Sequence, residues 1–303
     1  MSKDQNPRRD IGGGFCLTKA CKQGATGQSF LLTWMVNVEA IILCGGEAVR
    51  WANHMGVPKH LVPIDSVPLL HNTLAKLRQS GITRIVIAGR GEDYHLPQTG
   101  YLDVPQETCT APADKFNSSR ALWSKSGLTA LLFGDVFFSD AAIATLRQSQ
   151  PDAIAFLGRL TGSRITGCAS PEIFALTFGP LAHHVLDDAL AQIATAPTAR
   201  PTGWQLYNIL ADKAAVGDLP VPLRLTFNHV DDLTEDFDFP EDYQHWQSQR
   251  AKAGQVRMTD VASDRQAAQQ RMKRVWQVRA QLALLVGFLT GVFVTLLAWL
   301  VGA

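Results

Sequence analysis

The 303-residue sequence predicts an α/β fold with a mostly parallel sheet, followed by a C-terminal transmembrane helix. Short apolar runs alternate with segments of helical periodicity through most of the chain, which is typical of repeated βαβ units. The last 22 residues, 282–303, carry no charged side chain. As a helix they would measure about 33 Å, enough to cross a bilayer core of about 30 Å.

The composition is that of a globular protein with a full hydrophobic core. Apolar residues make up 46% of the chain, charged residues 18%, and the net charge is +1. Because the chain as a whole has no basic excess, we predict no nucleic-acid partner. The five cysteines form no CxxC pair and make a poor disulfide framework, which favours a reducing compartment.

The N-terminal segment differs from the rest of the chain. It is polar and glycine-rich without a long apolar stretch, so we interpret it as a poorly ordered extension rather than a signal peptide. Met35 precedes the first convincing strand and is an alternative start of translation. The predicted organisation is an extension over 1–34, an α/β domain over 35–250, a basic linker helix over 251–280 and a transmembrane helix over 281–303.

The first βαβ unit is expected over residues 38–89. The apolar run 38–44 predicts a buried strand, and the run 82–89 predicts a second one. Between them, leucines at helical spacing within 68–81 predict a helix that ends at Gly81.

The same alternation continues to about residue 246. Four further helices are expected, over 118–127, 140–150, 180–194 and 202–212. Strands are expected over 128–135, 152–158 and 172–178, and a last strand begins at residue 223 and leads to a final turn and helix.

A glycine-rich loop, CGGEAVRWANHMGVPKHL, follows the first strand. Backbone N–H groups at Gly45 and Gly46 can approach a phosphate closely. Arg50 and Lys59 add cationic contacts for a triphosphate and for the charge that develops during phosphoryl transfer. This combination in one strand-to-helix loop predicts a nucleotide-binding site.

Residues 40–77 resemble the opening signature of the NTP-transferase family, whose members build activated sugars, alditols and phosphocholine. The family pattern is an apolar strand, Gly-Gly-x-Gly-x-Arg, Pro-Lys-x-Leu, and then a small-residue turn with Pro-Leu-Leu. Ala48 stands where the family has its third loop glycine, and its methyl group resists a positive φ. The resemblance assigns nucleotide binding to Cys44, Gly45, Gly46, Glu47, Ala48, Arg50 and Lys59.

Two later segments resemble the family's metal-binding motifs. LLFGDVFFSD resembles a strand that ends in an acidic ligand, here Asp135, and TEDFDFPEDYQHW resembles the late acidic motif. Asp236 and Asp238 are two residues apart and would face the same side of a strand. Asp238 is the favoured second ligand and Asp236 the alternate, for Mg²⁺ held by carboxylates and phosphates. A solvated acidic loop is the alternative interpretation of this pair.

The resemblance implies a Rossmann-like three-layer sandwich of the glycosyltransferase-A type, as in MobA-like and nucleotide-diphospho-sugar transferases. The implied enzyme is a Mg²⁺-dependent nucleotidyltransferase, in which an acceptor phosphate attacks the α-phosphorus of an NTP and pyrophosphate leaves. Arg50 and Lys59 would be the catalytic cations. CTP is the favoured nucleotide, and a sugar phosphate, phospho-alcohol or phosphonate is the acceptor.

Candidate acceptor-binding residues fall in two segments. Arg164 and Glu172 lie in the stretch expected to cross the substrate side of the sheet, with an ordinary surface role as the alternative. Trp204 and Tyr207 would line an acceptor pocket or cage a quaternary ammonium group, and packing is the alternative that we weigh more heavily.

The flanks of the apolar C-terminal run predict its orientation. Basic side chains gather on its N-terminal side, so the positive-inside rule predicts a single-pass protein of the cytoplasmic membrane with its α/β domain in the cytoplasm. Gly287 and Gly291 are candidates for a helix-packing face. The sequence leaves the oligomeric state open, with a homodimer as one alternative. The basic residues of this flank are Arg257, Arg265, Arg271, Lys273, Arg274 and Arg279.

Two other functions stay open. A glycosyltransferase of similar fold would consume a nucleotide sugar, but its mid-chain Asp-x-Asp motif is replaced here by Gly134-Asp135-Val136. A catalytically silent, membrane-anchored scaffold has only Ala48 in its favour. Tethering would place the product of the enzyme near surface-glycan or lipid-headgroup assembly.

Overall fold

The structure, a computed structural model, describes residues 37–46, 49–105, 111–195 and 202–253. The predicted extension, the transmembrane helix and most of the linker helix lie outside these residues, as do Glu47 and Ala48. Within the described ranges, no helix is both long and apolar enough to cross a membrane.

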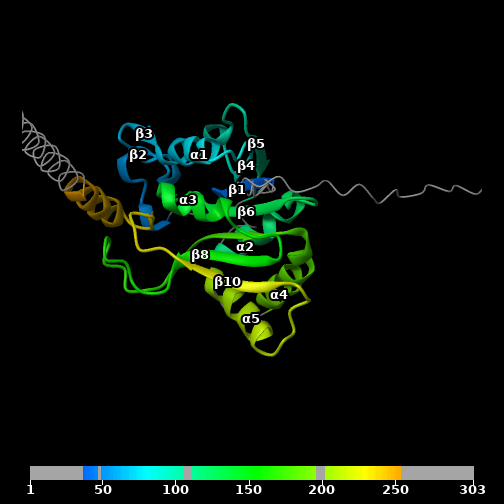
Figure 1. Cartoon of the computed structure of the whole chain (residues 1–303). Helices are drawn as coiled ribbons and strands as arrows, with labels where there is room; N and C mark the ends of the chain where they lie inside the picture. The colour runs from blue at the N-terminus through cyan, green and yellow to red at the C-terminus, as the bar shows by residue number, and fades with distance from the viewer. Residues whose placement is uncertain (1–36, 47–48, 106–110, 196–201, 254–303) are drawn as a thin grey trace, which may run out of the picture. The chain divides into compact units, whose positions relative to one another are not determined.

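A seven-stranded sheet with the order β10-β8-β9-β6-β1-β4-β5 forms the centre of the fold (Figure 1). Every strand pair in it is parallel except the two that β9 makes with β6 and β8. The predicted mostly parallel α/β sheet is therefore confirmed. The strands are β1 (Val38–Leu43), β4 (Arg84–Gly89), β5 (Gly100–Asp103), β6 (Leu128–Phe133), β8 (Ala153–Arg159), β9 (Glu172–Phe178) and β10 (Arg224–His229).

Two small ladders accompany the sheet. β2 (Pro63–Ile64) and β3 (Val67–Pro68) form a tight hairpin before the first helix. β7 (Val136–Phe137) pairs antiparallel with β11 (Glu235–Asp236), two segments that lie almost a hundred positions apart in the chain.

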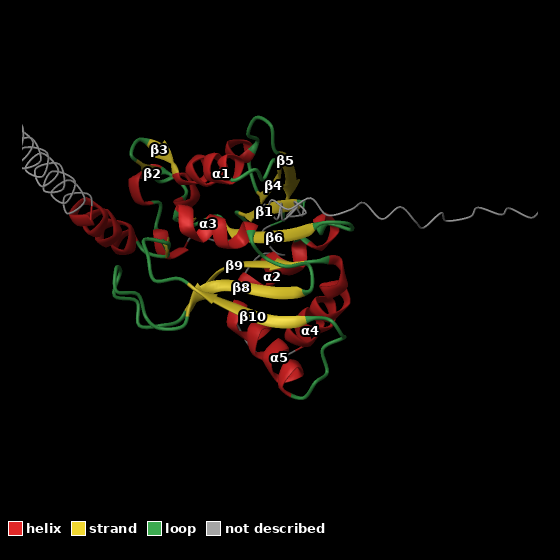
Figure 2. Ribbon diagram, in the orientation of Figure 1, coloured by secondary structure: helices red, strands yellow, loops and turns green. Residues whose placement is uncertain are grey.

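Helices cover both faces of the sheet (Figure 2). On one face α1 (Leu69–Gln79) contacts α3 (Asp140–Arg147). On the other face α2 (Pro112–Ser118), α4 (His183–Thr195) and α5 (Gly203–Ala215) contact one another. The leucines that predicted the first helix form the buried stripe of α1, as expected for an amphipathic helix on a sheet.

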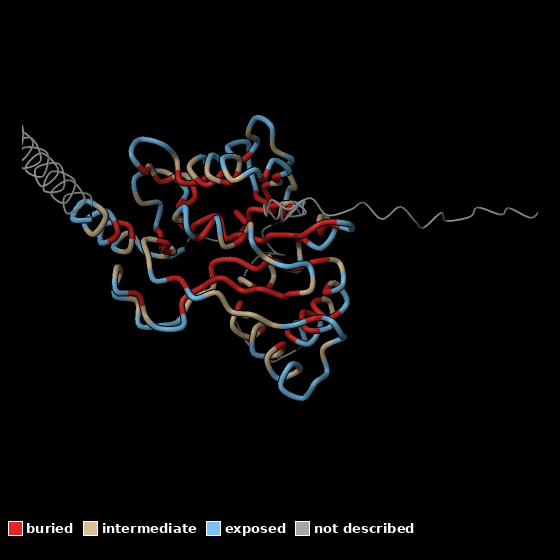
Figure 3. The backbone as a smooth tube through the Cα atoms, viewed as in Figure 1, coloured by how far each residue is buried: buried red, intermediate tan, exposed pale blue. Residues whose placement is uncertain are grey.

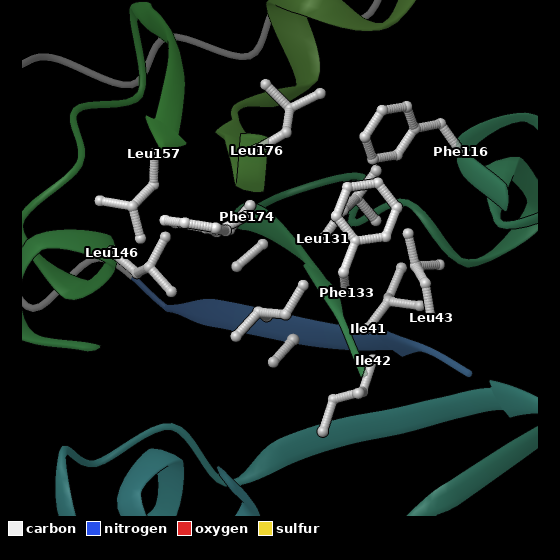
Figure 4. Packing of buried hydrophobic residues seen from close by; sticks show 14 of the residues in the cluster. Ile41, Ile42, Leu43, Phe116, Leu131, Phe133, Leu146, Leu157, Phe174 and Leu176 are labelled. Carbon is white, nitrogen blue, oxygen red and sulfur yellow. The ribbon is translucent and has the colours of Figure 1, made fainter. Parts of the chain in front are cut away.

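The hydrophobic core lies between the sheet and these helices. β6 is buried along its whole length and β1 at all positions but one, which explains why their sequences are continuous apolar runs (Figure 3). Figure 4 shows Phe116 of α2 beside Phe133 of β6, and Leu146 of α3 near Leu157 of β8 and Phe174 of β9.

A smaller hydrophobic cluster ties the hairpin to the helix over residues 240–253. Tyr243 donates a hydrogen bond to the Pro63 carbonyl at 2.5 Å, and the Trp246 indole donates to the Leu233 carbonyl at 2.8 Å. The helix runs through the predicted domain boundary at residue 250. The buried members of the cluster are Trp51, Val62, Ile64, Leu69, Phe137, Phe237, Tyr243 and Trp246.

The helix expected over residues 118–127 is wrong. α2 ends at Ser118 and a single 3₁₀ turn follows. The cause is Trp123, whose backbone is extended and whose buried ring packs edge-on against Phe178, with 4.9 Å between ring centroids. Its indole N–H donates to Ser119 Oγ at 3.1 Å, a contact made across the turn.

Candidate active site

The candidate site lies at the carboxyl ends of the parallel strands β1, β6 and β8. β1 leads into Cys44 and Gly45, β6 leads into Gly134 and Asp135, and β8 ends in Arg159. Ligands of open α/β sheets bind at this edge, because loops from neighbouring strands meet there.

The β7–β11 ladder brings the late acidic motif to Asp135. β7 follows Asp135 directly, and the Phe237 N–H donates to the Asp135 carbonyl at 3.1 Å. As a result, one carboxylate oxygen from each of Asp135, Asp236 and Asp238 lies within 4.8 Å of the others. The structure therefore groups both candidate second ligands with Asp135 and does not choose between them.

Lys59 extends into this cluster of carboxylates. Its Nζ forms an ion pair with Asp135 and lies 3.2 Å from Asp238 Oδ1. Burial alone would lower the pKa of Lys59, but the nearby carboxylates outweigh burial and raise it. Burial alone would raise the pKa of Asp135, but Lys59 and its other basic neighbours together outweigh burial and hold it well below its usual range. Both side chains are therefore charged at neutral pH.

Asp236 differs from the other two acids of the cluster, which form ion pairs with Lys59 or Arg50. Its Oδ1 atom is buried and has no hydrogen-bond partner within the described part of the chain. Burial, together with the carboxylates of Asp135 and Asp238, raises the pKa of Asp236 well above its ordinary value. A buried acceptor beside two further carboxylates is an environment that a bound cation would satisfy.

Arg50 closes the exposed side of the cluster. Its Nη2 lies 2.6 Å from Asp238 Oδ2, and its guanidinium lies 5.2 Å from the centroid of the Phe239 ring. Gly46 has a φ of 106°, a conformation that glycine adopts without strain. The two cations of the glycine-rich loop thus both contact acids of the cluster.

Close packing holds the floor of the loop. A side chain at Gly134 would meet the sulfur of Cys44 at 2.4 Å, so a larger residue beside Asp135 would have to displace this sulfur. Burial raises the pKa of the Cys44 thiol, which leaves it protonated, and its backbone N–H donates to Ala88 at 2.7 Å. The sequence associated Cys44 with nucleotide binding, and in the structure it is a packing residue beneath the loop.

His60 is a buried residue of the site that sequence reasoning missed. Its Nδ1 hydrogen-bonds with the Tyr94 hydroxyl at 2.9 Å, and burial lowers its pKa to about 3, so the ring is neutral. Its Nε2 is buried and has no hydrogen-bond partner among the described residues. A lone histidine beside Lys59 carries no sequence signal that would have revealed this contact.

A second buried charge network lies next to the carboxylates, around Arg159. Arg159 Nη1 donates to Glu235 at 3.0 Å and to Glu172 at 3.2 Å, and its Nη2 donates to the Thr234 carbonyl at 2.7 Å. The Ser163 hydroxyl donates to the other Glu235 oxygen at 2.6 Å. Sequence reasoning missed Arg159, whose only sequence signal is a charge at the end of an apolar strand.

The predicted acceptor residues separate into two groups. Glu172 belongs to the Arg159 network, and burial together with Glu235 raises its pKa to about 7. Arg164 is largely exposed, with its guanidinium 3.7 Å from Asp231.

Trp204 and Tyr207 lie on α5 and pack against Phe227 of β10. The Trp204 and Phe227 rings are stacked with 5.4 Å between centroids, and the Tyr207 ring meets Phe227 edge-on at 5.4 Å. The Trp204 indole donates to the Pro171 carbonyl at 2.9 Å. These contacts agree with the interpretation of Trp204 and Tyr207 as packing residues rather than as the lining of an acceptor pocket.

One family of known proteins matches part of this chain. Residues 40–175 match the family model of the MobA-like NTP transferase domain. The matched segment contains Lys59 and Asp135 and ends before Asp236 and Asp238. The match bears out the predicted family resemblance, and the predicted enzyme class, a nucleotidyltransferase, is confirmed. None of the curated proteins compared with the sequence matches it.

Solved structures with limited similarity to this chain include nucleotidyltransferases. The CTP:phosphocholine cytidylyltransferase of Streptococcus pneumoniae is 12% identical, with a TM-score of 0.46, over 69% of this chain and 97% of that one. The inositol-1-phosphate CTP transferase of T. maritima is 15% identical, with a TM-score of 0.48, over 70% of this chain and 96% of that one. At such values these similarities support no statement about the substrates of this chain.

Proposed function

We propose that this protein is a Mg²⁺-dependent nucleotidyltransferase that joins an NTP to a phosphorylated acceptor and releases pyrophosphate. The observation that carries the proposal is the meeting of three carboxylates with Lys59 at the end of the glycine-rich loop. CTP is the favoured nucleotide. A sugar phosphate, phospho-alcohol or phosphonate is the acceptor.

The carboxylate cluster fits a hard divalent cation. Asp135, Asp236 and Asp238 offer oxygen ligands from one compact group, and the buried Asp236 oxygen has no other partner within the described ranges. When bound, Mg²⁺ would neutralise phosphate charge. Its ligands would be these three carboxylates together with phosphate oxygens.

Lys59 and Arg50 would bind the phosphates. They form ion pairs with Asp135 and Asp238, two of the three carboxylates of the cluster. With a divalent cation held by the carboxylates, both side chains would be available to bind the triphosphate. The raised pKa of Lys59 keeps it charged for this role.

The reaction requires positioning rather than a covalent intermediate. An acceptor phosphate oxygen forms the new bond to the α-phosphorus while the bond to pyrophosphate breaks, in line. Lys59 and Arg50 would stabilise the charge that builds up on the phosphate oxygens.

The test is pyrophosphate release by the full-length chain with Mg²⁺. Each of the four NTPs is paired with sugar 1-phosphates, phosphocholine and aminoethylphosphonate. We expect release with one pair, lost in Asp135→Asn and kept in Asp152→Asn, which alters only an exposed ion pair with Arg224. If folded protein releases none with any pair, the proposal fails in favour of a scaffold. Transfer from a nucleotide sugar would instead favour a glycosyltransferase.

We further propose that residues 281–303 form a single-pass transmembrane helix, with the α/β domain in the cytoplasm. The charge-free run 282–303 and its basic N-terminal flank support this, and both lie outside the described residues. Such an anchor would place the product near surface-glycan or lipid-headgroup synthesis. Deleting 281–303 should move the protein from the membrane fraction to the supernatant, and retention in the membrane would contradict the anchor.

A further inference from the structure

Arg159 bonds the chain segment that carries two of the three clustered carboxylates. It stands at the end of β8, and its side chain is only 3% exposed. Its guanidinium donates both to the Glu235 side chain, at 3.0 Å, and to the Thr234 carbonyl, at 2.7 Å. The residue that follows these two is Asp236.

The segment needs such support, because its own ladder is short. β11 has two residues, and β7 is its only strand partner in the described structure. A two-residue ladder is not stable by itself. Glu235 and Asp236 are neighbours on this strand, so their side chains point to opposite sides. Fixing Glu235 on one side therefore fixes the direction of Asp236 on the other.

We propose that Arg159 is a positioning residue for the metal site. It holds β11 through Thr234 and Glu235, so that Asp236 and Asp238 keep the spacing that a divalent cation requires. The inference rests on the proposed metal site and adds to it a residue that touches neither cation nor substrate. Groups that orient metal ligands commonly change metal affinity by 10–100-fold when they are replaced.

The planar guanidinium is what the position demands. Arg159 serves three acceptors at once, on Glu172, Glu235 and the Thr234 carbonyl. A lysine has one compact ammonium group and cannot reproduce this fork. Stability alone does not explain the buried ion pair between Arg159 and Glu235. Such a pair is often no more stabilising than apolar residues of similar volume.

The experiment measures Mn²⁺ binding to the full-length chain, from the loss of the free-ion EPR signal, with Mn²⁺ as the probe for Mg²⁺. Arg159→Lys keeps the charge and loses the fork. The double variant Arg159→Met/Glu235→Gln removes both members of the fully buried pair and leaves only the partly exposed Glu172 without this partner. Arg224→Lys is the matched control. Arg224 also pairs with an acid, Asp152, but it is exposed and stands at the start of β10, at the end of the strands opposite to Arg159. Circular dichroism verifies the fold of each variant.

We expect Arg159→Lys and the double variant to bind Mn²⁺ about 10–100-fold more weakly than the wild type, and Arg224→Lys to be unchanged. Folded variants that bind Mn²⁺ within twofold of the wild type would overturn the inference while leaving the proposed function intact. Failure of both variants to fold would also overturn it, because Arg159 would then serve the fold alone. If wild type and Asp135→Asn bind Mn²⁺ equally, the metal site itself is refuted.

Discussion

Replacing Lys59 by methionine tests the charge balance of the site. The methionine fills a similar volume, but Asp135 and Asp238 lose their buried cation, and only Arg50 remains against three carboxylates. Breaking a buried ion pair on one side costs about 3–5 kcal/mol. For a domain of this size, 3 kcal/mol corresponds to a fall in Tm of about 6–12 °C. We expect this fall in Tm in the absence of a divalent metal. Mg²⁺ should restore at least half of the lost Tm, because it would neutralise the carboxylates in place of the Lys59 ammonium group.

Thermal unfolding of the full-length protein in EDTA and in millimolar Mg²⁺ measures both effects. Lys213→Met is the control, since it removes only the exposed pair with Asp218 and should change stability by less than about 1 kcal/mol. Pyrophosphate release by Lys59→Met should fall by at least about 100-fold. If the Tm of Lys59→Met in EDTA equals that of the wild type, Lys59 does not neutralise the carboxylates when no divalent cation is bound. A fall in Tm that Mg²⁺ does not reduce would contradict the same role.

Three further predictions concern stability. The pKa of Glu172 is raised from 4.5 to about 7 in the fold, so its ionisation destabilises the protein above pH 7 and not below pH 4.5. Glu172→Gln should therefore be more stable than the wild type at pH 8, by on the order of 1 kcal/mol, and equal to it at pH 4.5 in urea unfolding. Gly134→Ala should destabilise the protein by about 1–3 kcal/mol, because the new methyl group would meet Cys44. A urea midpoint equal to that of the wild type would contradict this packing. Trp246→Ala should cost about 3–5 kcal/mol by calorimetry, as it empties the smaller hydrophobic cluster, and a loss below 1 kcal/mol would be inconsistent with its burial.

Sequence reasoning succeeded where the signal is local. β1, α1 and β4 follow from the spacing of apolar side chains, because burial of a strand or of one helix face is encoded within each segment. The glycine-rich loop points to Lys59 and the end of a buried strand points to Asp135, and the topology brings both to one edge of the sheet.

Sequence reasoning failed where the contact is distant. Arg159 and Glu235 are 76 positions apart, and only the strand order places them together. The sequence favours Asp238 over Asp236, whereas the β7–β11 ladder draws both toward Asp135. The helix over 118–127 was mispredicted because the burial of Trp123 overrides local helix propensity.

The central claim is that Asp135, Asp236 and Asp238 hold a divalent cation beside an NTP bound by Lys59. A crystal structure with Mn²⁺ and a non-hydrolysable CTP analogue tests it most directly, through the anomalous signal of manganese. The account predicts a single strong peak at coordination distance from these carboxylates, with Lys59 moved from Asp135 to a phosphate. A bound nucleotide with no peak there, or with Lys59 still paired with Asp135, would contradict it.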